Sequence, residues 1–176
     1  GKSGVEVGTQ KAWELCEKYK LPRMIYVSNM DVDQASFRQV VEDMTAMFGK
    51  KMAPFHLPIR ENEKFVGYVN VITETGNRWQ GKDVVECEVP EYNKANLQIC
   101  RDTLMEAVAE TSEEMMERYF GGEIFSEAEI RAALRTNVCD GSIVPMTMGS
   151  NVLCQGVYTL LDDIIKYFPS PENRVV

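Results

Sequence analysis

The sequence is poor in the residues that build metal centres and disulfide frameworks. It has a single histidine, His56, and five cysteines, no two of which form a CxxC pair. Zinc sites use closely spaced cysteine and histidine ligands, and disulfide frameworks need an even number of cysteines. We therefore expect no zinc site, and reduced thiols in a cytoplasmic protein. We also expect His56 to be structural and not a general base, because the sequence places no evident nucleophile or carboxylate partner beside it.

Long hydrophobic runs and an excess of positive charge are also missing. No stretch approaches the roughly 18 apolar residues that a membrane-spanning helix needs. No basic region followed by an apolar stretch marks a signal peptide at the N-terminus. The formal net charge is −8 at pH 7, which repels phosphate backbones. The composition therefore argues against a membrane protein and against direct DNA or RNA binding through a basic surface, and it favours a basic or neutral protein partner.

The N-terminal 49 residues have the pattern of a doubly wound α/β fold. The expected order is helix, buried strand, loop and helix, over about residues 10–19, 24–27, 28–31 and 34–48. The strand is short and continuously apolar, as in a parallel sheet covered on both faces. Thr9 and Asp33 are the expected N-caps of the two helices, and Gly49 is the expected end of the second.

The pattern changes near Lys50 to short strands and then helices. Alternating and apolar segments predict strands over about 52–59, 65–72, 77–80 and 83–88, with turn residues between them at 61–63 and 76–77. One helix is expected over about 90–110. Two further helices should begin at capping boxes, in which a hydroxyl residue precedes a glutamate by three positions. These boxes are Thr111 with Glu114 and Ser126 with Glu129.

The α/β pattern returns near the C-terminal end of the sequence. Residues 143–146 predict a strand in which Pro145 is irregular or partly unpaired. A loop at 149–151 and a helix over 155–168 follow, and Pro169 to Pro171 begins a linker. The inward face of this helix should carry Val157, Leu160, Leu161, Ile164 and Phe168. We therefore predict an α/β fold with a parallel sheet over 1–49 and 142–176, interrupted by an inserted α+β subdomain with antiparallel strands over 50–141.

Taken in order, several segments resemble elongation factor G, a translational GTPase. They are the runs at 4–13, at 22–27 followed by Met30-Asp31, at 106–111, at 143–150 and at 167–171. The resemblance covers nearly the whole chain. It implies a partial P-loop-GTPase-like fold, with the inserted subdomain corresponding to the one called G′ in that family. It also implies a role in ribosomal translocation for the bacterial parent protein, of which this chain would be an internal piece.

The resemblance assigns guanine recognition to the loop that contains Asp31. In the family this aspartate accepts hydrogen bonds from the N1–H and the exocyclic amine of guanine, a charge-assisted and bidentate arrangement. Ser28 stands where the family has asparagine, and Asn29 stands where it has lysine. Serine is shorter with one donor, and Asn29 lacks the alkyl stem that lysine lays over the base. Taken without the resemblance, Asp31 is more simply interpreted as a loop or capping residue, because lone aspartates are common in loops.

A second loop, Gly149-Ser150-Asn151, stands where the family has Gly-Ser-Ala. The family's contact from this loop to the guanine carbonyl is made by a backbone N–H, which survives a change of side chain. Asn151 could therefore still donate, although its side chain is larger and could crowd the base. An ordinary strand-to-helix turn is the alternative, because serine and asparagine are common in such turns.

The parts of a GTPase that bind phosphate and Mg²⁺ are not found in this sequence. Gly1-Lys2-Ser3 resembles the end of a P-loop, but no GxxxxGK[ST] motif is complete and no apolar helix follows directly. Phosphoryl transfer depends on such positioning and charge stabilisation. We therefore expect GTP or GDP, with Mg²⁺, to bind the parent protein. The chain alone should bind guanine nucleotide weakly or not at all and should be catalytically inactive.

Two other functions remain open. The helices over about 90–136 carry a mixed charged surface and could form an interaction module, because the family's inserted subdomain is associated with the ribosomal stalk protein. Alternatively, the changes at Ser28 and Asn29 could mark a degenerate paralogue or a ribosome-protection-type factor. Translational GTPase subtypes share much of this layout, so the sequence leaves the subtype open.

Overall fold

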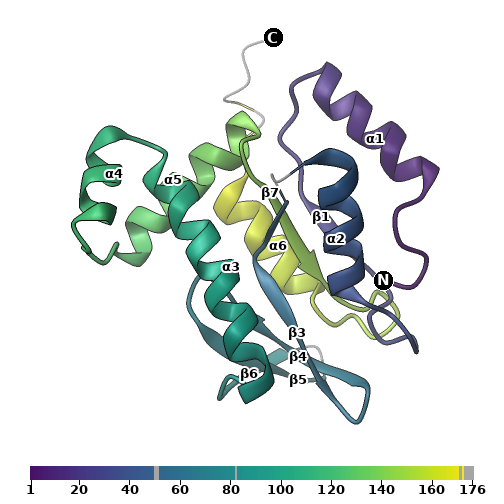
Figure 1. The fold of residues 1–176 in the computed structure, drawn as a ribbon. Coiled ribbons are helices and arrows are strands. Elements are labelled where there is room, and N and C mark those ends of the chain that lie inside the picture. Colours follow the sequence, from purple (N-terminus) through teal and green to yellow (C-terminus); the bar gives the residue numbers. More distant parts are fainter. Residues whose placement is uncertain (50–51, 82, 171, 173–176) are drawn as a thin grey trace.

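The fold is seen in a computed structural model that describes residues 1–49, 52–81, 83–170 and 172. Pro171, in the expected linker, and Lys50, where the pattern changes, lie outside the described residues. Within the described part the strands form two sheets, one parallel with order β1-β7-β2 and one antiparallel with order β3-β4-β5-β6 (Figure 1). The predicted fold class, an α/β parallel sheet combined with an antiparallel unit, is confirmed.

The parallel sheet brings together strands from distant parts of the chain. It consists of β1 (Ile25–Val27), β7 (Val144–Met148) and β2 (Met52–Pro54). The strand β7 lies in the middle and is buried along its whole length. Pro145 lies opposite Ala53 of β2, whereas the pairing with β1 starts one residue later, at Met146. Pro145 therefore has a paired residue in β2 but none in β1.

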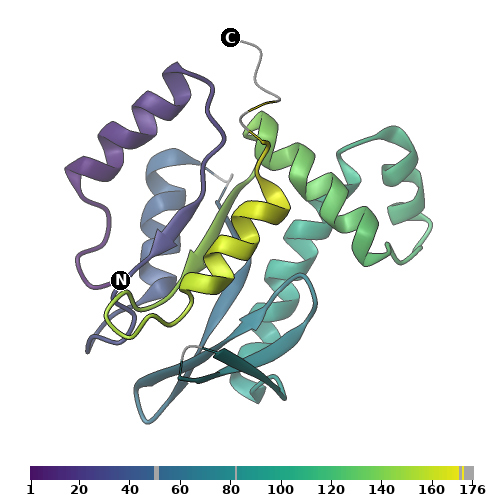
Figure 2. The same ribbon diagram turned by 180° about the vertical axis from the view of Figure 1, so that it is seen from behind.

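Helices cover this sheet on both faces. The helix α2 (Phe37–Phe48) lies on one face and α6 (Val157–Tyr167) on the other, as the two opposite views show (Figures 1 and 2). The helix α1 (Val7–Lys18) packs beside α2 through Trp13, whose ring stacks on Phe48 with 4.3 Å between centroids. Covering helices are what allow short, continuously apolar parallel strands to stay out of water.

The antiparallel sheet is a meander of consecutive strands. It contains β3 (His56–Glu61), β4 (Lys64–Asn70), β5 (Thr75–Gln80) and β6 (Asp83–Cys87). The turn between β3 and β4 is Asn62-Glu63, and both residues have positive φ, 48° and 67°. Two central residues with positive φ match the right-handed twist of a tight hairpin. The turn predicted near 61–63 is therefore confirmed. The turn predicted at Gly76-Asn77 is wrong, because both residues lie inside β5 and pair with β4 and β6.

The single strand predicted over 52–59 is wrong, because the chain changes sheets within it. Residues 52–54 pair with β7 in the parallel sheet, and β3 begins at His56 in the other. Phe55, which is fully buried, links both sheets: its N–H donates to Met146 O at 3.0 Å and its carbonyl accepts from Val71 N at 2.9 Å. Residues 52–59 are apolar or proline except for His56, so the sequence pattern gives no sign of the crossing.

The remaining helices, α3 (Glu91–Ala109), α4 (Glu113–Phe120) and α5 (Glu127–Asp140), follow the antiparallel sheet. The capping box of Ser126 and Glu129 is confirmed, and Ile130 and Leu134 are buried as predicted. The predicted cap at Thr111 is wrong: the Ser112 side chain accepts from Met115 N at 3.2 Å instead. Both residues carry hydroxyls, and only the backbone conformation selects between them.

Two N-caps near the start of the chain are also predicted wrongly. The helix α1 begins at Val7, after Glu6, so Thr9 lies inside the helix. The helix α2 begins after Ser36, whose hydroxyl accepts from Gln39 N at 3.2 Å, so Asp33 lies upstream of the helix. Gly49 ends α2 as predicted, with φ 91°. Several residues able to cap stand in a row here, and propensity alone does not rank them.

The predicted inward face of α6 is wrong in part. Val157, Leu160 and Phe168 are half-buried, but Leu161 is 49% exposed and Ile164 is 40% exposed. The buried residues of this helix are Asp163 and Tyr167, and the Tyr167 ring packs edge-on against Phe55 with 5.0 Å between centroids. Part of the apolar face of α6 is therefore open to water in the described residues.

Candidate functional site

The two loops singled out by sequence lie side by side at one edge of the parallel sheet. One loop follows β1 and carries Ser28, Asn29 and Asp31; the other follows β7 and carries Gly149, Ser150 and Asn151. Because β1 and β7 are adjacent and parallel, both loops leave the sheet at the same end, where α/β proteins bind their ligands. The N–H of Met30 donates to Gly149 O at 3.1 Å, which joins the loops directly.

The backbone of the first loop is sharply turned. Asn29 has φ 57°, a left-handed conformation that asparagine tolerates better than most residues. The Ser28 carbonyl accepts from the Gly1 nitrogen at 2.7 Å, and the Asn29 carbonyl accepts from Val32 N at 3.3 Å. These bonds hold Ser28 and Asn29 through their main chain, so their side chains take no part in fixing the turn.

Asp31 is half-buried and has one carboxylate oxygen without a partner. Its Oδ1 atom is buried and has no hydrogen-bond partner among the described residues. A buried acceptor left unpaired carries a desolvation cost of about 1–3 kcal/mol. The Asp31 side chain as a whole is only half-buried, and its carboxylate is the kind of acceptor that a ligand with N–H donors needs.

The second loop is closed by its own backbone. The N–H of Ser150 donates to Gln155 O at 2.9 Å, and the N–H of Gln155 donates back to Ser150 O at 3.0 Å. The buried Ser150 hydroxyl accepts from Leu153 N at 3.1 Å. Among the backbone hydrogen bonds of the described residues, none uses the N–H of Asn151, which is exposed. Asn151 is therefore the residue of this loop whose N–H is free to meet a ligand.

Gly149 lies where the two loops and β1 approach most closely. A Cβ atom at this position would overlap both the Gln155 carbonyl oxygen and the Tyr26 hydroxyl. Tyr26, on β1, also donates to the same carbonyl at 3.3 Å. Glycine at this position is thus required by packing, since backbone of the second loop occupies the space that a side chain would need.

Arg60, on β3, is a residue that the sequence analysis did not predict as part of this region. Its Nη2 atom donates to Met30 O at 3.0 Å and to Ala35 O at 2.8 Å, two carbonyls on either side of Asp31. Arg60 follows Met30 by 30 residues and lies in a segment predicted as sheet and turn. No local spacing signals such a contact.

A cavity of about 280 Å³ adjoins the first loop on its other side. Ser28 and Asn29 line it together with β1, α2 and residues 1–6, whereas Asp31 and residues 149–151 do not. Gly1-Lys2-Ser3 contributes to this wall, and α1 starts only at Val7. The cavity is thus separate from the unpaired carboxylate oxygen of Asp31.

Comparison with known proteins gives the family of this arrangement. A family model for the GTP-binding domain of elongation factor Tu matches residues 1–170. The chain belongs to this family. A crystal structure of a protein from Thermus thermophilus is similar as well, with a TM-score of 0.88 and 32% sequence identity. The match covers 98% of this chain and 26% of the Thermus protein, so the chain spans about a quarter of that relative.

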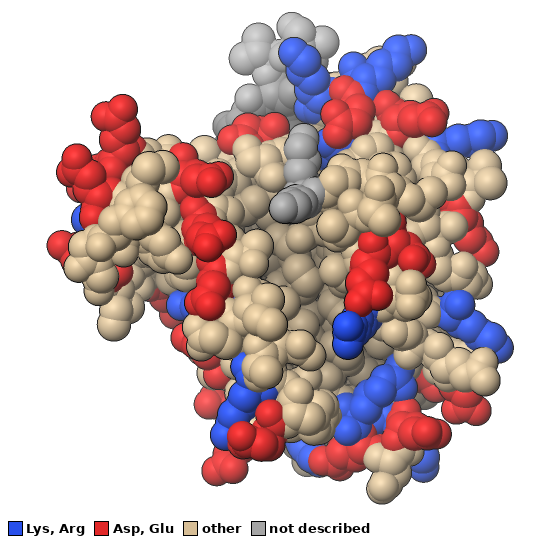
Figure 3. Space-filling view, in the orientation of Figure 1, with Lys and Arg blue, Asp and Glu red and all other residues tan. Residues whose placement is uncertain are grey.

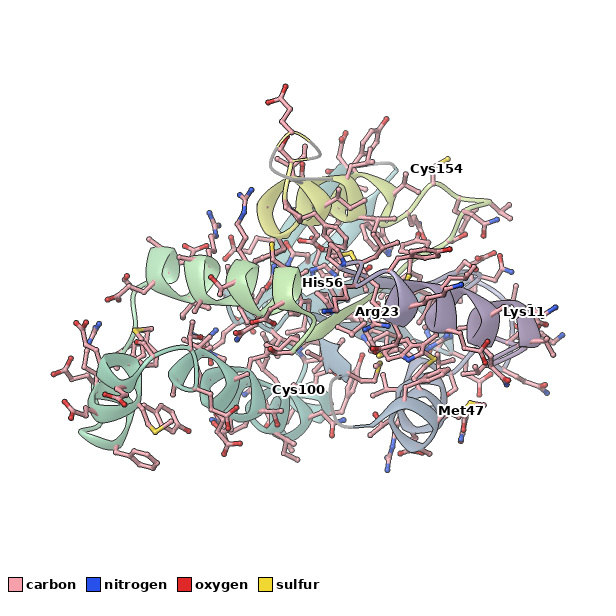
Figure 4. The ribbon with its side chains drawn as sticks, turned by 90° about the horizontal axis from the view of Figure 1, so that it is seen from above. Lys11, Arg23, Met47, His56, Cys100 and Cys154 are labelled. Carbon is pink, nitrogen blue, oxygen red and sulfur yellow. The ribbon has the colours of Figure 1, made fainter. Side chains whose placement is uncertain are left out.

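This member of the elongation factor Tu GTP-binding domain family keeps its histidine inside the fold. His56 is buried, and Figure 4 shows it in the interior, whereas Cys154 of the second loop lies at the periphery. Burial, with a smaller contribution from Lys166, lowers the pKa of His56 from 6.5 to about 3. Its carboxylate neighbour is Asp163, 3.7 Å away on α6, a partner that the sequence did not reveal. A neutral histidine enclosed in this way is structural.

The described part of the domain contains neither a cluster of metal ligands nor a membrane-spanning helix. No group of three or more histidine, cysteine, aspartate or glutamate side chains there could hold a metal ion. No described helix combines the length and the apolar character needed to cross a membrane. Guanine nucleotide is the ligand that membership of this family implies.

Proposed function

We propose that this chain is the guanine-reading part of a bacterial translation elongation factor of the elongation factor G type. In this proposal residues 1–49 and 142–176 belong to the GTP-binding domain, and residues 50–141 form its inserted subdomain. The parent protein binds GTP with Mg²⁺, hydrolyses it in the cytoplasm and moves along the ribosome. The segment itself supplies base recognition and no phosphate chemistry.

Asp31 carries this proposal. Its buried Oδ1 atom has no hydrogen-bond partner in the part of the chain that the structure describes, and its loop is bonded to Gly149 of the second loop through Met30. We propose that the carboxylate accepts from N1–H and the amine of guanine, and that the Asn151 N–H donates to the guanine carbonyl. Ser28, Asn29, Gly149 and Ser150 would shape the pocket around the base. Adenine lacks this donor pair, so the site would reject it.

Two exposed features support a larger GTP-binding domain around this segment. The strand β1 pairs with β7 on one side, and within the described residues no strand pairs with its other edge. Leu161, Ile164 and Ile165 leave the apolar stripe of α6 open to water. We propose that the phosphate-binding half of the domain packs against this edge and this helix in the parent protein. The chain alone would then bind guanine nucleotide weakly.

The decisive experiment replaces Asp31 by asparagine in the full-length gene product that contains this segment. An amide offers a donor where the carboxylate accepts, so the variant should lose GDP affinity by about 10- to 100-fold. It should gain affinity for xanthosine diphosphate, whose carbonyl replaces the amine of guanine. Asp33→Asn is the matched control, because Asp33 is exposed in the same loop. Equal effects of the two substitutions, or no effect of Asp31→Asn, would contradict the proposal.

A second candidate function is an interaction module for the ribosomal stalk. Phe120 is 80% exposed and lines a groove of about 230 Å³ between α3 and α4. Acidic side chains gather over α4 and α5 (Figure 3), among them Glu113, Glu114 and Glu117 on α4. A stalk pull-down at low and high salt tests this function. Phe120→Ala should weaken capture, whereas Tyr158→Ala, an exposed aromatic substitution on α6, should not.

A degenerate nucleotide site is the remaining alternative, and the Ser28-Asn29 pair motivates it. Restoring the family pattern by Ser28→Asn and Asn29→Lys in the full-length protein should raise GTP affinity if decay is the cause. Lysine would have to adopt the φ of 57° that Asn29 now has, which costs about 1 kcal/mol. If the protein is instead a ribosome-protection-type factor, it should already bind GTP tightly without the substitutions, and they should leave its GTP affinity unchanged.

A further inference from the structure

The guanidinium of Arg60 bridges two parts of the fold that are distant in sequence. On one side its Nη2 atom donates to the carbonyls of Met30 and Ala35. On the other its Nη1 atom donates to Glu63 O at 2.7 Å, in the β3–β4 turn. One planar side chain thus ties the antiparallel sheet to the loop that carries Asp31, and the fixed fork of its donors sets the spacing between them.

Arg60 lies beside a β-bulge at the end of β3. The register between β3 and β4 shifts there: Ile59 lies opposite Gly67, whereas Arg60 lies opposite Phe65, so Val66 of β4 is the extra residue. Successive side chains of a strand point to opposite faces of the sheet. Ile59 is fully buried and Arg60 is half-buried, so Ile59 faces the core and the Arg60 side chain is left to reach the loop.

The main chain of Arg60 is held independently by α3. The Tyr92 hydroxyl accepts from Arg60 N and donates to Arg60 O, both at 2.9 Å. Tyr92 stands in the first turn of α3. The arginine is therefore fixed at its backbone by a helix and at its tip by the turn, and its Nη2 atom donates to the two loop carbonyls.

The loop depends on these two bonds because it has little regular structure of its own. Asn29 and Gln34 both have positive φ, 57° and 66°, which few residues adopt without support. Met30 is fully buried, so its carbonyl has no water to replace a lost donor. Asp31 lies between the two anchored carbonyls, and its position relative to a bound base follows from theirs.

We propose that Arg60 is a positioning residue that holds the loop of Asp31 in the geometry that reads guanine. This inference rests on the proposed function, since it assigns the loop to base recognition. It makes a distinct claim, namely that discrimination by the loop depends on a side chain of the antiparallel sheet. Arg60 itself does not touch the nucleotide.

The test compares Arg60→Met, Arg60→Lys and Tyr92→Phe with Arg38→Met as control, in the full-length gene product. Arg38 is exposed on α2, and its side-chain partner among the described residues is Glu42 on the same helix. The readout is the ratio of affinities for GDP and IDP, because IDP lacks the exocyclic amine that Asp31 would accept from. Arg60→Met should lower this ratio about tenfold, the loss of one well-aligned hydrogen bond to a charged group. Arg60→Lys, with one ammonium in place of the fork, should fall between.

A second readout needs no nucleotide. Amide hydrogen exchange of residues 28–36 should accelerate in Arg60→Met and, less strongly, in Tyr92→Phe, while exchange in α5 stays unchanged. Acceleration together with a reduced GDP-to-IDP ratio supports the inference. An unchanged loop, or equal losses of GDP and IDP affinity at a constant ratio, overturns it and indicates a general structural role.

The Asp31→Asn variant separates this inference from the function on which it rests. If Asp31→Asn abolishes discrimination between GDP and IDP while Arg60→Met leaves it intact, the proposed function stands and the positioning role is overturned. If Asp31→Asn leaves discrimination intact, both are overturned. If Arg60→Met prevents folding, Arg60→Lys and Tyr92→Phe give the same comparison under milder change.

Discussion

His56 Nε2 lies 3.7 Å from Oδ2 of Asp163, and both side chains are buried between β3 and α6. Burial lowers the pKa of His56 to about 3 and raises the pKa of Asp163 from 3.8 to about 7. Lys166 and Asp162 on α6 contribute smaller and opposing effects to the carboxyl, and the Tyr68 ring lies 4.6 Å from the imidazole. The pair is thus neutral over most of the acid range.

This neutral pair predicts opposite pH dependences for its two halves. Between pH 3 and 6.5 the unfolded chain binds a proton at His56 that the folded chain does not, so this contribution to stability falls as pH falls. Between pH 3.8 and 7 the folded chain keeps a proton on Asp163 that the unfolded chain has released, so this contribution falls as pH rises. Between pH 3.8 and 6.5 the two contributions to stability change in opposite directions and nearly cancel.

Replacing one residue of the pair should reveal the pH dependence of stability that the other contributes. Relative to the unchanged protein, Asp163→Asn should become more stable as pH rises from about 4.5 to 6.5, by at most about 1.4 kcal/mol per pH unit. His56→Gln should show the reverse slope. Urea unfolding of the three proteins at several pH values measures this. Two variants with parallel slopes would contradict the opposite pKa shifts of the two groups.

Gly149 predicts a steric limit on the second loop. Alanine at this position would overlap the Gln155 carbonyl oxygen and the Tyr26 hydroxyl, so the loop must shift, at a cost of about 1–3 kcal/mol. Gly8→Ala is the matched control, since a Cβ atom there meets nothing within 4 Å and Gly8 lies in α1. That substitution should be neutral or stabilise by up to about 1 kcal/mol. Thermal unfolding compares them, and a tolerated Gly149→Ala would show that the loop yields easily.

Adjacent hydroxyl residues before α4 allow the assignment of its cap to be tested directly. Ser112 accepts from Met115 N, whereas the Thr111 hydroxyl donates back to Ala107 O at 3.4 Å. Ser112→Ala should therefore cost about 1 kcal/mol in the free energy of unfolding. Thr111→Ala should change it by less than about 0.5 kcal/mol. If urea titrations show that Thr111→Ala costs more than Ser112→Ala, then Thr111 is the N-cap of α4.

The open stripe of α6 predicts a substitution that is harmless in the chain alone. Ile165 is 74% exposed, so Ile165→Lys should change the free energy of unfolding of the 176-residue chain by less than about 0.5 kcal/mol. Phe55→Ala, at a fully buried position, should cost about 3–5 kcal/mol. In the full-length protein Ile165→Lys should be clearly destabilising if another part of the domain covers this helix. Equal effects in both contexts would mean that the stripe stays in water.

The proximity of the two candidate loops followed from sequence order, because a short apolar strand precedes each loop and parallel strands end at the same edge. Asp31 was identified by the residues around it and not by its own chemistry, and whether it reads guanine stays a prediction. Arg60 escaped notice for a physical reason. It acts through backbone carbonyls, which every residue possesses, so its partners Met30 and Ala35 carry no sequence signal.

The sequence by itself determined the alternation of helices and buried strands, the end of α2 at Gly49 and the capping box at Ser126. Each of these depends on local conformation, which nearby residues set. Only the tertiary structure decided that Phe55 passes between two sheets and that α6 buries Asp163 while exposing Leu161. Burying an apolar side chain lowers the free energy of the folded state whichever apolar surface it meets, because the hydrophobic effect is non-directional. Which surface each one meets is therefore set by the packing of the whole chain.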